Sequence, residues 1–164
     1  MRITSPAPVF DANATAGGSL GNLPEWDLSD LYTGEDAPEL TRDMAWLEKA
    51  CADFAADYEG RLAALDAKGM LECVLRYEKI DVIGGRIMSF AGLRYYQNTM
   101  DSGRAKFFSD CQDKITTFTT PLVFFTLEIN RIEDAKLDAL FAANAELARY
   151  RPIFERLRAM RPYQ

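Results

Sequence analysis

Residues 77–132 decide the fold, and they read YEKIDVIGGRIMSFAGLRYYQNTMDSGRAKFFSDCQDKITTFTTPLVFFTLEINRI. The middle of this stretch, Gln97–Gly103, is rich in turn formers and separates two apolar-periodic runs. The apolar side chains recur every three or four residues: Ile80, Ile83, Ile87 and Phe90 before the turn, and Phe108, Cys111, Ile115, Phe118, Leu122, Phe125 and Ile129 after it. Such a period is typical of amphipathic helices, and the short connection predicts that the two helices are antiparallel neighbours. We therefore expect an all-α fold, an antiparallel helical hairpin or bundle with short accessory helices.

The overall composition narrows the class of protein. A chain of 164 residues with 48% hydrophobic content is sufficient for one domain, or for one domain with a tail. No run approaches the roughly 18 apolar residues of a membrane helix, and the N-terminus lacks the apolar segment of a secretory signal. The net charge of -6 repels phosphate backbones. The sequence thus predicts no membrane and no nucleic acid among the partners.

The cysteine and histidine content limits the chemistry. Cys51, Cys73 and Cys111 are far apart and form no CxxC pair, which predicts buried reduced thiols in a cytoplasmic protein. The chain contains no histidine, which removes nucleophile systems that use histidine and every histidine-based metal site. Carboxylate chemistry remains possible, but it needs paired residues that face a cleft. We identify no such pair, and we predict no catalytic, cofactor-binding or metal-binding residue in this chain.

The N-terminal region changes character at Leu23. Residues 1–22 are rich in small and polar residues and are predicted to form a disordered tail. The motif Leu23–Tyr32 then reads LPEWDLSDLY, with apolar residues at the spacing of a single helical turn. It fits either a docking motif for another protein or a segment that packs Trp26 and Leu31 on its own domain. We favour the second interpretation because large apolar residues are usually buried.

A first long helix is expected to begin near Asp36. Asp36 and Glu39 resemble a capping box, and Pro38 suits the first turn. Gly60 is predicted to end this helix, and a second helix start follows at Asp66–Gly69. The helix has a regular apolar repeat: Leu40, Met44, Leu47, Cys51, Phe54 and Tyr58. The repeat fits a coiled-coil seam for a partner, but its short length favours packing within its own bundle.

Small residues interrupt the helix that precedes the turn. Gly84, Gly85, Ser89 and Gly92 lie within it, although a helical glycine costs roughly 1 kcal/mol relative to alanine. Close approach of another helix explains them, and a hinge at Gly84–Gly85 is the alternative. Arg94 follows on the apolar face, where we expect either a carboxylate partner within the fold or a ligand carboxylate, the former being favoured.

The helix after the turn should be bent. Asp101 is the expected N-cap, and Pro121 inside the apolar pattern predicts a bend near Thr117–Thr120, whose hydroxyls can satisfy freed carbonyls. Phe124 and Phe125 cover more than one helix face, so this half should be buried from two sides.

Two shorter helices are expected at the end of the chain, at about residues 133–142, closed by Asn144, and at about residues 151–160. This region is rich in arginine, at Arg149, Arg151, Arg156, Arg158 and Arg161. The arginines fit an anion or peptide-terminus site, although a solvated or interdomain face is favoured.

Several motifs in this order resemble the oligoendopeptidase F family, zinc metallopeptidases related to the thimet oligopeptidases. They are Leu23–Tyr32, Gly85–Tyr96 (GRIMSFAGLRYY), Pro121–Glu128 (PLVFFTLE) and Tyr150–Pro152 (YRP). The resemblance covers about residues 23–164. It implies that this region is a helical N-terminal lobe, truncated before the catalytic domain, which walls a channel for short peptides.

In the family, a His-Glu-x-x-His helix and a downstream glutamate hold the zinc, and the glutamate between the histidines acts as general base. The resemblance therefore implies zinc for the complete enzyme, a catalytic domain as partner, short peptides as substrates and no peptidase activity of this chain alone. The alternative is a stand-alone helical protein that binds partners or self-associates. For a lobe without its catalytic domain, we expect self-association of the isolated chain through an exposed surface formed by Phe124, Phe125, Leu127, Ile153, Phe154 and Leu157.

Overall fold

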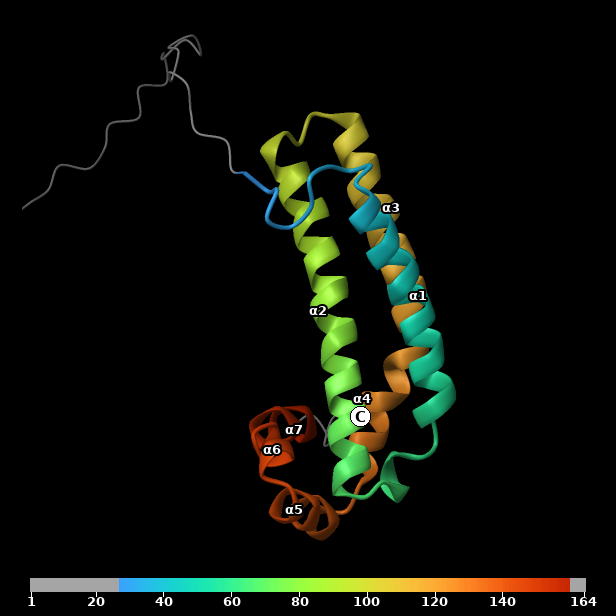
Figure 1. The fold of residues 1–164 in the computed structure, drawn as a ribbon, viewed down its shortest axis with the longest axis vertical. Coiled ribbons are helices and arrows are strands. Elements are labelled where there is room, and N and C mark those ends of the chain that lie inside the picture. The colour runs from blue at the N-terminus through green and yellow to red at the C-terminus, as the bar shows by residue number, and fades with distance from the viewer. Residues whose placement is uncertain (1–26, 160–164) are drawn as a thin grey trace, which may run out of the picture.

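The computed structural model of the protein describes residues 27–159 (Figure 1). The predicted tail at residues 1–22 lies outside the described residues, as does Trp26. Within residues 27–159 the regular elements are helices and no strand occurs, which confirms the all-α class. The elements are α1 (Pro38–Tyr58), the 3-10 helix η1 (Leu62–Ala64), α2 (Ala67–Gln97), α3 (Ser102–Thr119), the 3-10 helix η2 (Thr120–Leu122), α4 (Val123–Arg131), α5 (Asp134–Ala143), α6 (Ala145–Ala148) and α7 (Arg151–Arg158).

The long helix α2 is the element on which the others pack. Helices α1 and α3 lie alongside it, and a loop at residues 98–101 joins α2 to α3 at one end of the molecule (Figure 1). Helix α4 and the short helices α5, α6 and α7 gather at the other end, around the first turns of α2 (Figure 1). The fold is therefore a bundle of long helices with a cluster of short helices at one end.

The apolar stripe of α1 faces the core of this bundle. Leu47, Cys51 and Phe54 are at most 1% exposed. The Phe54 ring contacts Tyr77 of α2 and Phe124 of α4, with ring centroids 5.7 and 5.9 Å apart. The heptad-like repeat of α1 thus serves packing within its own domain, the interpretation favoured from the sequence.

The segment before α1 also packs on its own domain. Tyr32 is 1% exposed, its ring meets Phe90 edge-on, and its hydroxyl donates to the buried Asp43 carboxylate at 3.0 Å. The Arg86 guanidinium lies 4.5 Å from the centre of the Tyr32 ring and 3.6 Å from the Asp43 carboxylate. Because a buried carboxylate needs a cationic partner, this cluster anchors the segment to α1 and α2. In the described part of the motif, Tyr32 is buried and Leu28 and Leu31 pack partly buried against the core, as the favoured interpretation expected, whereas Asp27, Ser29 and Asp30 are exposed.

The predicted cap at Asp101 is present, and Asp66, which was expected only to mark a helix start, is also an N-cap. The Asp66 side chain accepts a hydrogen bond from the Gly69 amide at 2.7 Å, and the Asp101 side chain accepts one from the Gly103 amide at 2.8 Å. Gly60 has a φ of 76°, a left-handed conformation that favours glycine, directly after the C-cap of α1. These local signals were read correctly from the sequence.

The predicted capping box at the start of α1 is wrong. The N-cap is Ala37, with no side-chain cap, and Pro38 occupies the first turn as expected. The Glu39 carboxylate instead accepts a hydrogen bond from the Thr33 hydroxyl at 2.9 Å. The hydroxyl of Thr33, in the turn before the helix, thus occupies the Glu39 carboxylate, which a capping box would need as the acceptor for the N-cap amide.

At Pro121 the predicted helix is interrupted and not only bent. Helix α3 ends at Thr119, η2 carries the proline, and α4 begins at Val123. Threonine hydroxyls of this region donate to carbonyls one turn earlier: Thr117 to Asp113 at 2.9 Å, Thr119 to Ile115 at 2.8 Å and Thr120 to Thr116 at 2.7 Å. None of these is the Thr117 carbonyl, which loses its amide partner at Pro121, so these bonds do not bear out the prediction that the hydroxyls satisfy freed carbonyls. Phe124 and Phe125 are both buried, which confirms that this half is covered from two sides.

The end of the described chain differs from the prediction in one element. Helices α5 and α7 lie within one or two residues of their predicted bounds. The short helix α6 between them was missed. Asn144 was predicted only to close α5, but its side chain also accepts hydrogen bonds from the Glu146 and Leu147 amides at 3.0 and 3.1 Å and so starts α6.

Candidate functional site

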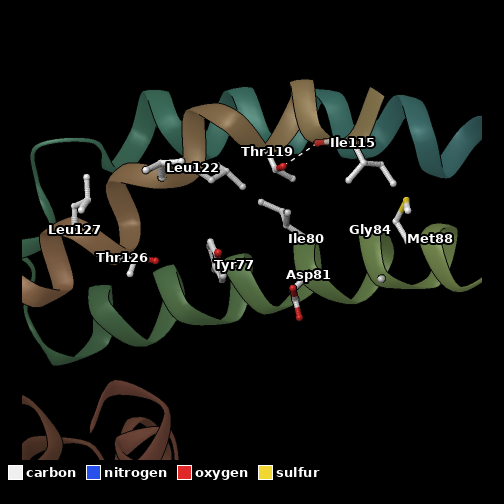
Figure 2. Close-up of a pocket in the computed structure, with 12 residues that line it drawn as sticks. Tyr77, Ile80, Asp81, Gly84, Met88, Ile115, Thr119, Leu122, Thr126 and Leu127 are labelled. Atoms are coloured by element: carbon white, nitrogen blue, oxygen red, sulfur yellow. Dashed lines mark hydrogen bonds between the residues drawn. The ribbon is translucent and has the colours of Figure 1, made fainter. Parts of the chain in front are cut away.

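A groove runs between α2 and the α3–η2–α4 segment (Figure 2). Its volume is about 540 Å³, and its side chains come from both walls. The lining residues are mostly apolar: Tyr77, Ile80, Asp81, Gly84, Gly85, Met88, Ile115, Thr119, Leu122, Val123, Thr126 and Leu127. The wall opposite α2 contains the break at Pro121, because the lining residues of that wall flank η2 on both sides.

Few polar groups reach this groove. The Thr119 hydroxyl donates to the Ile115 carbonyl, drawn as a dashed line in Figure 2. The Tyr77 ring stacks on Phe125 at a centroid distance of 4.2 Å, and burial, together with the Asp81 charge, raises the pKa of Tyr77. Tyr77 is therefore a neutral wall of the groove at pH 7, and Asp81 supplies its charge.

A second hollow, of about 270 Å³, continues from the first between α2, α4 and α7. The two hollows share Tyr77, Asp81 and Thr126, and we call them together the furrow. Glu78 lies in the second hollow, where its carboxylate accepts a hydrogen bond from the Tyr150 hydroxyl at 2.9 Å. The charged residues that line the furrow are Asp81 and Glu78, both of them acidic.

The small residues of α2 do not act as one packed strip. A Cβ atom added at Gly84 would lie 3.7 Å from Leu47, and one added at Gly92 would lie 3.6 Å from Phe108, which are ordinary contacts. At Gly85 nothing lies within 4 Å, and both Gly85 and Ser89 are exposed. Helix α2 continues through both glycines without interruption. The favoured interpretation, close helix packing along the strip, is therefore wrong at Gly85, which opens onto the furrow.

Three of the arginines singled out from the sequence, Arg94, Arg151 and Arg158, have partners within the fold, whereas Arg149 and Arg156 are exposed. Arg94 forms an ion pair with Glu35 at 3.4 Å, the structural alternative that the sequence favoured. Arg151 pairs with Asp138 at 2.8 Å, and Arg158 donates to the carbonyls of Ile129 and Ile132 and pairs with Asp134. Arg161 lies outside the described residues.

The association surface predicted from the sequence is largely buried. Phe124, Phe125 and Phe154 are at most 9% exposed and belong to the core. That part of the prediction is wrong, because these rings pack inside the fold, Phe124 and Phe125 on Phe54 and Phe154 on Phe141. Leu127 and Ile153, at 38% and 56% exposed, do remain accessible and border the furrow.

The described residues do not fit a zinc site. Within residues 27–159, no group of three or more histidine, cysteine, aspartate or glutamate side chains is placed to hold a metal ion. Burial raises the pKa of Cys51 and Cys111 to about 11 and that of Cys73 to about 12. Since the thiolate is the metal ligand and the nucleophile, these buried thiols suit neither role. We assign no reaction step to zinc in this chain.

Comparison with protein families gives a match at the end of the chain. Residues 128–164 match the model of the peptidase M3 N-terminal family described as Oligopeptidase F. The match supports an N-terminal region of the oligoendopeptidase F family, the resemblance recognised in the sequence. Comparison with curated proteins and with solved structures finds no match. In the part of the chain that the structure describes, no helix is long and apolar enough to cross a membrane.

Sequence reasoning named no site residue and missed the furrow. The sequence drew attention to Gly84–Gly85 as a packing or hinge position, and only the structure shows the open space beside Gly85.

Proposed function

We propose that this chain forms the helical N-terminal lobe of a cytoplasmic zinc metalloendopeptidase of the oligoendopeptidase F type, which acts on short peptides. The observation that carries the proposal is the match at residues 128–164. The described part of that segment belongs to the same helical body as the rest of the chain. Ile129 and Leu147 are fully buried, and Tyr150 donates a hydrogen bond to Glu78 of α2.

The lobe would help to form the substrate channel and would supply no catalytic group. The chain has no histidine, so the zinc ligands and the general base of such an enzyme would come from sequence outside these 164 residues. The lobe would wall one side of the substrate channel and hold the catalytic domain in position. Its partners would be that domain and the peptides that enter the channel.

The first test is the genomic sequence that follows codon 164. An open reading frame that continues to a His-Glu-x-x-His motif supports the proposal, whereas a stop codon at that position argues for a stand-alone protein. The second test is activity on a short quenched-fluorescence peptide. We expect no hydrolysis by the 164-residue chain with added zinc, and hydrolysis that a chelator abolishes once the catalytic domain is present.

Hydrolysis by the 164-residue chain alone would contradict the proposal, provided that a mock purification from cells without the chain shows none. The alternative function is a stand-alone helical module for protein interaction or self-association. The exposed apolar furrow favours this alternative, because such a surface commonly binds another protein. A stop codon, together with concentration-dependent dimers in sedimentation, would support it.

A further inference from the structure

The furrow combines an apolar surface with an acidic charge. Its two hollows are lined largely by apolar side chains, and Val123, Leu127 and Ile153 on its borders are 60%, 38% and 56% exposed. The charged residues that line it, Asp81 and Glu78, are both acidic. A contiguous apolar surface with one sign of charge selects partners by their shape and their charge.

We propose that the furrow binds an amphipathic helix that carries a lysine or arginine facing Asp81, and that the catalytic domain of the same enzyme supplies this helix. The inference rests on the proposed function for the source of the helix. Docking of an apolar helix face into a groove between helices is a recurrent mode of protein recognition.

The backbone of α2 favours the close approach that this docking needs. Nothing lies within 4 Å of the position that a Cβ atom would take at Gly85, and the residue is exposed. A side chain at this position would project into open space beside the groove floor. A glycine in a helix costs roughly 1 kcal/mol relative to alanine, and at this position it relieves no contact inside the fold. Close approach of a partner's backbone to α2 would explain why a glycine stands here.

The charges decide which helix the furrow accepts. Glu78 is already hydrogen-bonded to the Tyr150 hydroxyl, whereas the Asp81 carboxylate is exposed at the junction of the two hollows. An ion pair with an exposed carboxylate adds little affinity, but an acidic residue facing Asp81 would be repelled. The expected effect is therefore selectivity for a basic over an acidic helix. A second copy of this chain is disfavoured by its net charge of -6.

The first experiment uses two designed helical peptides with the same leucine and alanine face. One carries lysine at the centre of the polar border, the other glutamate, and binding to the full chain is measured by fluorescence anisotropy at low salt. We expect the lysine peptide to bind about fivefold more tightly, within the range of one exposed ion pair. Asp81→Lys should reverse this order.

Matched variants separate the furrow from general surface effects. Glu72→Lys changes the net charge as Asp81→Lys does, at an exposed position on α2 that lines neither hollow, and should leave the order unchanged. Gly85→Leu should weaken both peptides at least tenfold by filling the groove, while Ser89→Leu, one turn further along, should not. Circular dichroism melting should show that Gly85→Leu remains folded. Equal binding of both peptides to wild type, or equal binding to Gly85→Leu and wild type, would overturn the proposal.

The second experiment identifies the source of the helix. A co-expressed catalytic domain should bind the wild-type chain and bind Gly85→Leu at least tenfold more weakly. Equal binding to both would refute this inference and leave the proposed function standing. If the catalytic domain does not bind the wild-type chain, the proposed function and the catalytic domain as source of the helix are both refuted. The peptide experiment would still measure whether the furrow prefers a basic over an acidic helix. Dimers of the chain that Gly85→Leu dissolves would show that a second copy fills the furrow, which also overturns the proposal.

Discussion

Glu128 connects distant parts of the chain, and its removal gives a sharp test of the fold. Its carboxylate accepts hydrogen bonds from the Gly60 amide at 2.6 Å and from the Leu62 amide at 3.2 Å. These amides belong to the connection between α1 and α2, whereas Glu128 belongs to α4. One side chain therefore holds the α1–α2 connection against α4, at the first residue of the segment that matches the family model.

The size of the effect follows from the two hydrogen bonds. A hydrogen bond to a charged group contributes roughly 1.5–3 kcal/mol. The Gly60 amide is exposed and finds water when the carboxylate is removed, whereas Leu62 is fully buried and its amide is harder to solvate. We therefore expect Glu128→Ala to lower the free energy of unfolding by about 2–3 kcal/mol. Glu128→Gln retains one acceptor oxygen, so it should lower that energy by about 1 kcal/mol.

Urea unfolding followed by circular dichroism at 222 nm measures these differences. For a domain of this size, the Glu128→Ala loss corresponds to a fall in Tm of about 4–10 °C. Glu48→Ala, at an exposed position on α1, is the matched control and should change the unfolding energy by less than about 0.5 kcal/mol. If Glu128→Ala has no larger effect than this control, the carboxylate does not hold the connection and the reasoning fails.

Three further predictions concern backbone and burial. Gly85→Ala should raise the free energy of unfolding by about 0.5–1 kcal/mol, because its Cβ meets no atom, whereas Gly60→Ala should lower it by about 1 kcal/mol, because φ there is 76°; urea unfolding distinguishes these signs. The three buried thiols should resist Ellman's reagent at pH 8 and react fully in urea. Burial raises the pKa of these thiols from 9.0 to about 11 or 12, so the stability that they contribute is complete below pH 9 and is lost as pH rises through the folded pKa. The urea concentration at the unfolding midpoint should therefore decrease when the pH is raised from 8 to 10.5. An unchanged midpoint would contradict this. Pro121→Ala restores an amide that can donate to the Thr117 carbonyl, so hydrogen exchange at the α3–η2 junction should slow; unchanged exchange would show that packing sets the break.

The sequence predicted those features of the fold that depend on neighbouring residues. The apolar stripes placed α2, and they placed α3 and α4 as one bent helix, because helical periodicity is a local property. Asp101 was recognised as a cap and Asp66 as part of a helix start, and each bonds amides within the next three residues. Arg94 was expected to find a carboxylate, although periodicity gave no means of identifying Glu35, which lies 59 residues away.

The errors arose where a more distant or competing group decided the outcome. Glu39 was available for a capping box, but the Thr33 hydroxyl uses its carboxylate. Phe124 and Phe154 were expected on the surface because a single helix does not show how many neighbours cover it. Burial of Phe154 against Phe141, whose rings meet edge-on at 5.3 Å, depends on how α5 and α7 are arranged.

The furrow depends on two local features of the sequence that only the three-dimensional structure brings together. From the sequence, Pro121 predicted a bend and Gly85 predicted close helix packing or a hinge, and neither pattern placed the two residues together. In the fold, the groove lies between the glycine pair of α2 and the residues that flank η2, on both sides of the break (Figure 2). An unbroken helix would present a regular row of side chains to α2, and that row would fill the space beside Gly85. The break at Pro121 and the missing side chain at Gly85 therefore account together for a groove that neither residue predicts alone.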